Sequence, residues 1–156
     1  MRPDALEIVR DDLAHPAVRA LLRTHLEGMR AASPPGHSFA LDLSGLRTPD
    51  VTVWTAWIEG ELAGVGALKT HNAALGEVKS MRTDPAHLRR GVGRALLDHV
   101  IAEAKAAGLI QLSLETGRGP AFAPALALYR RRGFVDGGPF ADYEDAGFSQ
   151  FMHLAL

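Results

Sequence analysis

The chain has 156 residues, of which 47% are hydrophobic and 22% charged, and its formal net charge is −1. This length and composition fit one soluble globular domain over residues 1–156 and do not suggest a general attraction to nucleic acid or to a membrane surface. The chain contains no cysteine, which excludes disulfides, a cysteine nucleophile and thiolate metal ligands.

The rest of the composition adds expectations about location and metals. No apolar run approaches the length of a membrane span, and the N-terminal residues lack the apolar core of a signal peptide. We therefore expect a cytoplasmic protein. The 7 histidines are scattered and form no HExxH or His-x-His pattern, so no metal site is expected.

The first third of the chain predicts a short strand and a helix. Leu6–Arg10 reads as the strand. His15–Ala31 reads as the helix, because its apolar residues recur at three- and four-residue spacings, and the sequence Ser33-Pro34-Pro35-Gly36 ends it. Phe39–Leu46 is ambiguous, and a second short helix is one interpretation.

Three consecutive strands are predicted next, over Val51–Ile58, Leu62–Thr70 and Leu75–Thr83. The first is apolar on both faces, as expected for a strand that is covered on both sides. Glu59-Gly60-Glu61 provides a hairpin turn between the first two. Gly64 and Gly66 in the second strand indicate a close backbone approach or a β-bulge.

The last third alternates helices and strands. A helix over residues 91–107 precedes a strand over Ile110–Glu115, and a second helix over Phe122–Arg132 precedes a strand that opens at Phe134–Val135. Ser149–Ala155 alternates and is the final strand. The order predicts an α/β fold with a mixed sheet of six to seven strands and helices on both faces.

The segment Arg89–Arg94 combines glycines and arginines immediately before a helix. Glycine lets a ligand approach the backbone closely. The first N–H groups of a helix lack intrahelical partners, and the helix dipole adds positive charge at that end. Arg89, Arg90 and Arg94 add full charges, so the segment predicts a phosphate-binding site.

Two motifs resemble the GNAT family, the Gcn5-related N-acetyltransferases. Residues 88–93, Leu-Arg-Arg-Gly-Val-Gly, are similar to the family pattern [Q/R]-x-x-G-x-[G/A], with Leu88 departing at the first position. Ala125–Phe134 is similar to the later A-x-x-L-Y-x-x-x-G-F pattern. Leu112–Gly117 and Phe140–Tyr143 resemble a small bacterial branch of the family whose substrates are largely unassigned.

The resemblance implies both a fold and an activity. It implies the GNAT fold, in which two central strands splay apart and the pantetheine arm of acetyl-CoA lies between them. It also implies transfer of acetyl from acetyl-CoA to a primary amine of a small molecule or peptide. We expect direct attack in a ternary complex, because no cysteine is present to carry the acetyl group.

The resemblance also assigns roles to residues. Glu77 is the expected base, although it could instead be a structural carboxylate paired with Lys79 or Arg82. Tyr129 is the expected acid at the CoA sulfur. Phe122 stands where many relatives have a cofactor-contacting Asn. The expected cofactor-binding residues are Met81, Arg82, Thr83, Arg89, Arg90, Gly91, Val92, Gly93, Arg94, Phe122 and Tyr129.

The acceptor site is the least specific expectation. In this fold it is formed by the first helices, the strand before the phosphate loop and the last hairpin. The candidates by position are His25, Met29, Ser33, His37, Glu115, Phe140 and Tyr143.

Three alternatives remain open on sequence grounds. The departures at Leu88 and Phe122 allow a non-catalytic module that binds acyl-CoA. Gly91-x-Gly93 with Glu115 about twenty residues later weakly resembles a dinucleotide site, but the third glycine is missing. A homodimer could form through the last strands, where the apolar side chains either provide a surface or fill the core.

Overall fold

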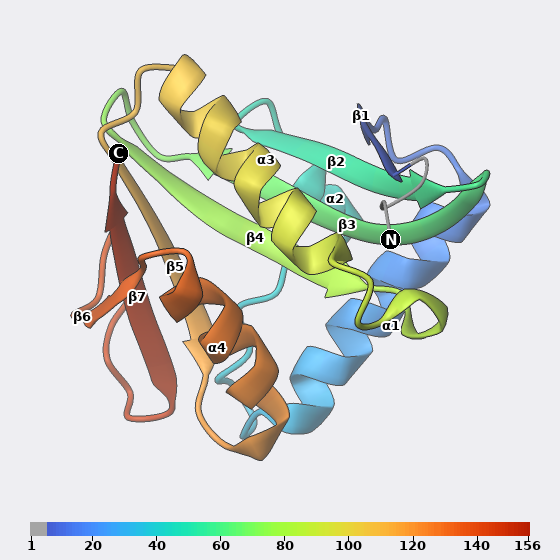
Figure 1. Ribbon diagram of the computed structural model, residues 1–156. Helices are drawn as coiled ribbons and strands as arrows, with labels where there is room; N and C mark the ends of the chain where they lie inside the picture. The colour runs from blue at the N-terminus through green and yellow to red at the C-terminus, as the bar shows by residue number, and fades with distance from the viewer. Residues whose placement is uncertain (1–5) are drawn as a thin grey trace.

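The computed structural model describes residues 6–156, and its seven strands form one sheet in the order β1-β2-β3-β4-β5-β7-β6 (Figure 1). The β4–β5 pair is parallel and the other neighbours are antiparallel, so the predicted mixed sheet is confirmed. The strands are β1 Leu6–Arg10, β2 Val51–Ile58, β3 Glu61–Thr70, β4 Leu75–Thr83, β5 Gln111–Gly117, β6 Val135–Gly137 and β7 Ser149–Ala155.

Helices cover both faces of this sheet, as predicted. They are α1 Pro16–Ala32, α2 Leu43–Leu46, α3 Val92–Ala106 and α4 Ala123–Arg131. The apolar stripe of α1 packs with Val53 and Val65 in one core. Leu96 and Leu97 of α3 pack with Trp54 and Tyr129 in a second core on the opposite face.

Several predicted boundaries need correction. The ambiguous segment Phe39–Leu46 is helical only over α2, where the Asp42 side chain accepts a hydrogen bond from the Gly45 N–H at 2.9 Å and caps the helix. A 3-10 turn at Pro120–Phe122 delays α4 to Ala123. The strand predicted to end at Glu115 continues to Gly117, because β7 pairs with it along its whole length.

The bulge predicted near Gly66 is confirmed. The β3–β4 register moves from Val65↔Arg82 to Ala67↔Lys79, so two residues of β4 oppose Gly66. Ser80, in the bulge, has a φ of +54°, and a Cβ on Gly66 would lie 2.6 Å from the Met81 sulfur. The glycine therefore makes room for the bulge.

The parallel pair β4–β5 is short and then opens. It joins only Leu75–Glu77 to Gln111–Ser113. Beyond these residues β4 stays paired with β3, and β5 stays paired with β7. The two strands consequently diverge toward their carboxyl ends (Figure 1), which leaves space in the middle of the sheet.

Two apolar side chains of the last strand, which the sequence leaves open as a dimer surface or as core, are buried. Phe151 and Met152 of β7 are 2% and 0% exposed, so these two side chains fill the core of the chain itself. No helix within residues 6–156 combines the length and the apolar character that crossing a bilayer requires.

Candidate active site

A cavity of about 370 Å³ lies where β4 and β5 diverge. Residues 78–83 of β4 and 114–117 of β5 form its two walls. His25 and Met29 of α1 line it from one face of the sheet, and Ala125 and Tyr129 of α4 line it from the other. The cavity therefore passes through the sheet, and a ligand entering from one face can reach a group bound at the other.

The N-terminus of α3 has the features of the predicted phosphate site. Gly91 precedes the helix with a φ of +78° and makes no side-chain cap, and the Ala95 N–H is the first to bond back to it. The N–H groups before Ala95 are left without intrahelical partners. Arg89 and Arg90 precede this turn and Arg94 lies in the first turn of α3, and all three side chains are exposed.

The glycine-rich turn joins the main cavity through a smaller one. A cavity of about 200 Å³ is lined by Gly93 together with Met81, Thr83 and Tyr129, the last three of which also line the main cavity. The side chain of Val92 is 1% exposed and packs in the core, so only its backbone is available to a ligand.

Tyr129 occupies the position where these two cavities meet. Its ring packs edge-on against Phe134 with centroids 5.8 Å apart. Burial raises the pKa of its hydroxyl to about 12, so the group stays protonated at neutral pH and is a hydrogen-bond donor.

Arg82 lies on the other face of the sheet from α3. A Cβ built on Gly28 of α1 would be 3.0 Å from its Nη2 atom, whereas the preceding Met81 packs with the α3 core. Arg82, which the sequence places among the cofactor-binding residues, also lines the smaller cavity beside Gly93, but its guanidinium does not point toward the start of α3, because α1 and α3 cover opposite faces of the sheet. Its guanidinium instead lies beside the α1 side of the cavity.

The two departures from the family motifs both line the main cavity. Phe122 is 4% exposed and packs against Phe148 at a centroid distance of 5.8 Å. It also fills the space beside Gly117, where an added Cβ would lie 2.4 Å from its ring. Leu88 is 58% exposed, and its apolar side chain provides no charge for a phosphate.

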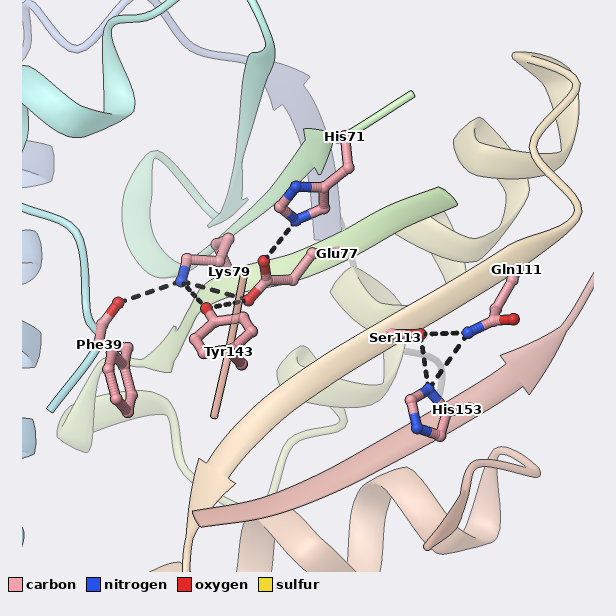
Figure 2. A network of polar contacts seen from close by, with 8 residues as sticks. All are labelled: Phe39, His71, Glu77, Lys79, Gln111, Ser113, Tyr143 and His153. Atoms are coloured by element: carbon pink, nitrogen blue, oxygen red, sulfur yellow. Dashed lines mark hydrogen bonds and ion pairs between the residues drawn. The ribbon is translucent and has the colours of Figure 1, made fainter. Parts of the chain in front are cut away.

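Glu77 lies in a buried polar network that Figure 2 shows from close by. It is 1% exposed. Its Oε1 atom is 2.8 Å from His71 Nε2. Its Oε2 atom accepts a hydrogen bond from the Tyr143 hydroxyl at 2.6 Å and lies 3.3 Å from Lys79 Nζ. Lys79 also donates to the Phe39 carbonyl at 3.1 Å.

This network closes Glu77 off from the cavity. Lys79 lines the cavity, but Glu77 does not. Tyr143 covers the carboxylate, and burial together with the Glu77 charge raises the pKa of its hydroxyl far above the ordinary value. Tyr143 and Phe140, both expected at the acceptor site, pack against each other with ring centroids 5.0 Å apart, and neither lines the cavity.

Glu115 is the carboxylate that does line the cavity. It extends from β5, and its Oε2 atom accepts a hydrogen bond from the Ser149 hydroxyl at 2.7 Å. Burial raises the pKa of Glu115, and the nearby charge of Glu77 adds to this, while the Ser149 bond and Lys79 act in the opposite direction. A carboxylate with a raised pKa is a stronger base than an ordinary one.

The α1 side of the cavity holds the remaining acceptor-site candidates, His25, Met29, Ser33 and His37. His25 is 6% exposed. Burial and the charges of Arg82 and Lys79 lower its pKa to about 4, so its ring is neutral at physiological pH.

Sequence reasoning missed two parts of this side of the site. Ser38 and Phe39 follow α1 and line the cavity without belonging to any regular element, so no periodic pattern pointed to them. Ser80 reaches the cavity through the β4 bulge. Gly66 was the available signal for the bulge, but it does not specify which residue of the partner strand is extruded.

A Ser–His pair elsewhere in the sheet is structural. Ser113 Oγ lies 2.8 Å from His153 Nδ1, and the Nε2 atom of that histidine lies 2.8 Å from the Gly138 carbonyl (Figure 2). Ser113 is 0% exposed and does not line the main cavity, so the pair cannot present a nucleophile to a ligand there. It ties β5 to β7 and to the loop before it.

The chain is similar to several known proteins over nearly its full length. The family model described as "Acetyltransferase (GNAT) family" matches residues 17–134. The uncharacterized N-acetyltransferase YedL of Escherichia coli is 48% identical over 96% of this chain and 94% of its own length. The uncharacterized N-acetyltransferase YsnE of Bacillus subtilis is 47% identical over 97% of this chain and 100% of its own length. The IAA acetyltransferase of Azospirillum brasilense is 40% identical over 79% of this chain and 80% of its own length.

Solved structures agree with the family model. A Klebsiella pneumoniae protein assigned to the acyl-CoA N-acyltransferases has a TM-score of 0.82 and 29% identity, covering 97% of this chain and 98% of that one. A GNAT family acetyltransferase of Elizabethkingia anophelis has the same fold, with a TM-score of 0.71 at 20% identity, over 98% of this chain and 99% of that one. The resemblance read from the two motifs is therefore confirmed, and the chain belongs to the GNAT family of acetyltransferases.

Proposed function

We propose that this enzyme transfers an acetyl group from acetyl-CoA to a primary amine of a small molecule or peptide by direct attack in a ternary complex. The single observation that carries the proposal is the cavity that passes through the sheet between β4 and β5. It links the sheet face covered by α3 and α4, where a helix N-terminus can bind phosphate, to the face covered by α1, where the Glu115 carboxylate can accept a proton. Two substrates entering from opposite faces would meet there.

The cofactor side is proposed to be the α3 and α4 face. The unpartnered N–H groups after Gly91 and the charges of Arg89, Arg90 and Arg94 suit a pyrophosphate. The structure of the Elizabethkingia anophelis relative contains acetyl-CoA, and a Bacillus subtilis acetyltransferase of the same fold was solved with CoA. The pantetheine arm would then follow the gap between β4 and β5 toward Tyr129.

We propose Glu115 as the base. An ammonium group must lose a proton before it can attack a thioester. The base must therefore reach the cavity, which Glu115 does and Glu77 does not. The raised pKa of Glu115 strengthens it for this task. Glu77, whose two oxygens are already bonded, is proposed to hold the site together.

Tyr129 is proposed as the acid that protonates the departing thiolate. It lies on the cofactor face, lines the cavity, and keeps its proton at neutral pH. The attacking amine, the thioester and this hydroxyl would be arranged in line through the sheet. The transfer needs no enzyme-bound acetyl intermediate, which agrees with the absence of cysteine.

The test has two stages. Thermal unfolding with acetyl-CoA should show a raised midpoint, because a ligand that binds only the folded state stabilises it, and NADH as a control should leave the midpoint unchanged. Release of the CoA thiol is then measured with a panel of primary amines. A midpoint shift without thiol release from any amine would favour the non-catalytic acyl-CoA-binding alternative, and the absence of a shift would contradict the cofactor site.

A further inference from the structure

The α1 side of the cavity carries charges of both signs. Glu115 lines the wall formed by β5, and Arg82 lines the wall formed by β4 and α1. The third charged side chain lining the cavity is Lys79, whose ammonium group is already bonded to Glu77, Tyr143 and the Phe39 carbonyl. Among residues 6–156 no carboxylate forms an ion pair with Arg82.

Buried polar atoms without partners surround the same space. The Nδ1 atom of His25 and the hydroxyl of Ser80 make no hydrogen bond within the described chain, although their residues are only 6% and 7% exposed. The same holds for His37 Nδ1 and Ser38 Oγ. All four residues line the cavity. Buried polar groups are normally paired, so these atoms indicate a polar ligand.

The electrostatics on this side favour an anion. The pKa of the buried His25 is lowered partly by the charges of Arg82 and Lys79. A group that carries negative charge would offset these two cations, and the guanidinium of Arg82 can bind a carboxylate through two parallel hydrogen bonds. The neutral ring of His25 can add a further hydrogen bond.

We propose that the acceptor is a small amino acid, whose carboxylate binds Arg82 near His25 and Ser80 while its amine faces Glu115. The proposal rests on the acetyl transfer proposed above and specifies its substrate class. The two charges of the amino acid match the two opposite charges of the walls. One proton passes from the ammonium group to Glu115, and the amine nitrogen then forms a bond to the acetyl carbon. The carbon–sulfur bond breaks with its electron pair leaving on the CoA sulfur, which takes the Tyr129 proton. The second proton that the nitrogen loses restores the Tyr129 hydroxyl, and the proton on Glu115 passes to solvent.

The test compares each standard amino acid with its methyl ester, which keeps the amine and removes the negative charge. Release of CoA thiol at saturating acetyl-CoA gives kcat/KM for both forms with the wild-type chain and with Arg82→Gln. Because esterification also changes the basicity of the amine, the acid-to-ester ratio is compared between the two proteins. Arg23→Gln, which removes an exposed arginine of α1, is the matched control.

We expect Arg82→Gln to lower kcat/KM for the preferred amino acid by about 10- to 100-fold, mainly through KM, because a charge-assisted hydrogen-bond pair is lost. In Arg82→Gln, kcat/KM for the ester, the KM for acetyl-CoA and the thermal midpoint should change little. Arg23→Gln should leave all of these quantities, and kcat/KM for the amino acid, unchanged. If Arg82→Gln lowers kcat/KM equally for the amino acid and its ester, or raises the KM for acetyl-CoA, the proposal is overturned.

Two further arms separate this inference from the proposed function. If phosphoethanolamine is preferred to every amino acid, the anion bound by Arg82 is a phosphate and the carboxylate assignment is wrong. If no amine releases thiol, the acetyl transfer itself fails. Binding is then measured as the shift of the thermal unfolding midpoint when CoA and an N-acetylated amino acid are added together. A midpoint shift that Arg82→Gln abolishes supports the carboxylate site without turnover, and the lack of any shift overturns it.

Discussion

Glu77 and Glu115 are two carboxylates on adjacent strands and the same face of the sheet, yet they have opposite environments. Glu77 opposes Ser113 in the last pair of the β4–β5 ladder, and three side chains surround it. Glu115 follows Ser113 by two residues, beyond the point where the strands separate, and it lines the cavity.

The difference shows what the separation of the strands does. Where β4 and β5 pair, a carboxylate is enclosed and serves the structure. Two residues further along β5, Glu115 faces the cavity, and Ser149 is its only hydrogen-bond partner among residues 6–156. Removing the charge of Glu115 should therefore lower activity, whereas removing the charge of Glu77 should lower stability.

The largest effect is expected from Glu115→Gln. The amide keeps the shape of the side chain but cannot accept a proton from the amine. We expect kcat to fall by about 10²- to 10⁴-fold, the usual range for loss of a general base, while acetyl-CoA still raises the thermal midpoint. Steady-state thiol release measures the loss, and an activity within twofold of wild type would contradict the assignment.

Glu77→Gln should instead lower stability. It leaves the buried Lys79 ammonium group without its carboxylate partner, and breaking a buried ion pair costs about 3–5 kcal/mol. Urea unfolding of Glu77→Gln, Glu115→Gln and wild type in parallel gives the comparison directly. If Glu77→Gln keeps full stability but loses turnover, its role and that of Glu115 are exchanged.

Tyr129→Phe is expected to lower kcat by about 10²-fold, at the low end for a general acid, because a thiol with an ordinary pKa near 8.5 is already a fair leaving group. The substitution keeps the buried ring and its contact with Phe134, so stability and acetyl-CoA binding should be retained. Unchanged turnover in the thiol-release assay would exclude Tyr129 as the acid.

At Glu115, activity and folding stability should depend on pH with opposite signs. Because burial raises its pKa above 4.5, kcat/KM should fall as the pH drops through that raised value, and the fall should be absent in Glu115→Gln. The stability effect has the opposite sign. The folded state holds this proton more tightly than the unfolded state, so the stabilisation is present at low pH and is lost as the pH rises through the folded pKa. Glu115→Gln should therefore be no less stable than wild type at neutral pH.

The smallest effect concerns the proposed phosphate site. Gly91 and Gly108 have φ values of +78° and +82° at the two ends of α3, and an added Cβ meets nothing within 4 Å at either. Alanine at either position should cost roughly 1–2 kcal/mol of backbone strain. Only Gly91→Ala should also weaken acetyl-CoA binding, which titration calorimetry would measure, and equal binding losses at both ends would contradict the site.

The family, the order of the elements and the glycine-rich turn before α3 could all be predicted from the amino-acid sequence. These features are local: a glycine pair before a helix, an apolar repeat, and two motifs that each lie within about ten consecutive residues. The bulge at Gly66 could also be predicted, because a glycine inside a strand is a local signal. Glu77 could be singled out through the resemblance to the family, but the side chains that surround it could not be predicted.

Two features of the site became clear only from the folded structure: which carboxylate lines the cavity, and which face of the sheet Arg82 occupies. The first depends on where the parallel ladder stops, which no local pattern specifies. The second depends on which residue of β4 the bulge extrudes, and Gly66 predicts the bulge without specifying that residue. The partners of Glu77 are His71, Lys79 and Tyr143, and Tyr143 is 66 positions away along the chain. Such contacts arise only when the sheet closes, because the sequence specifies each strand locally, whereas the environment of a side chain depends on every strand and loop that packs around it.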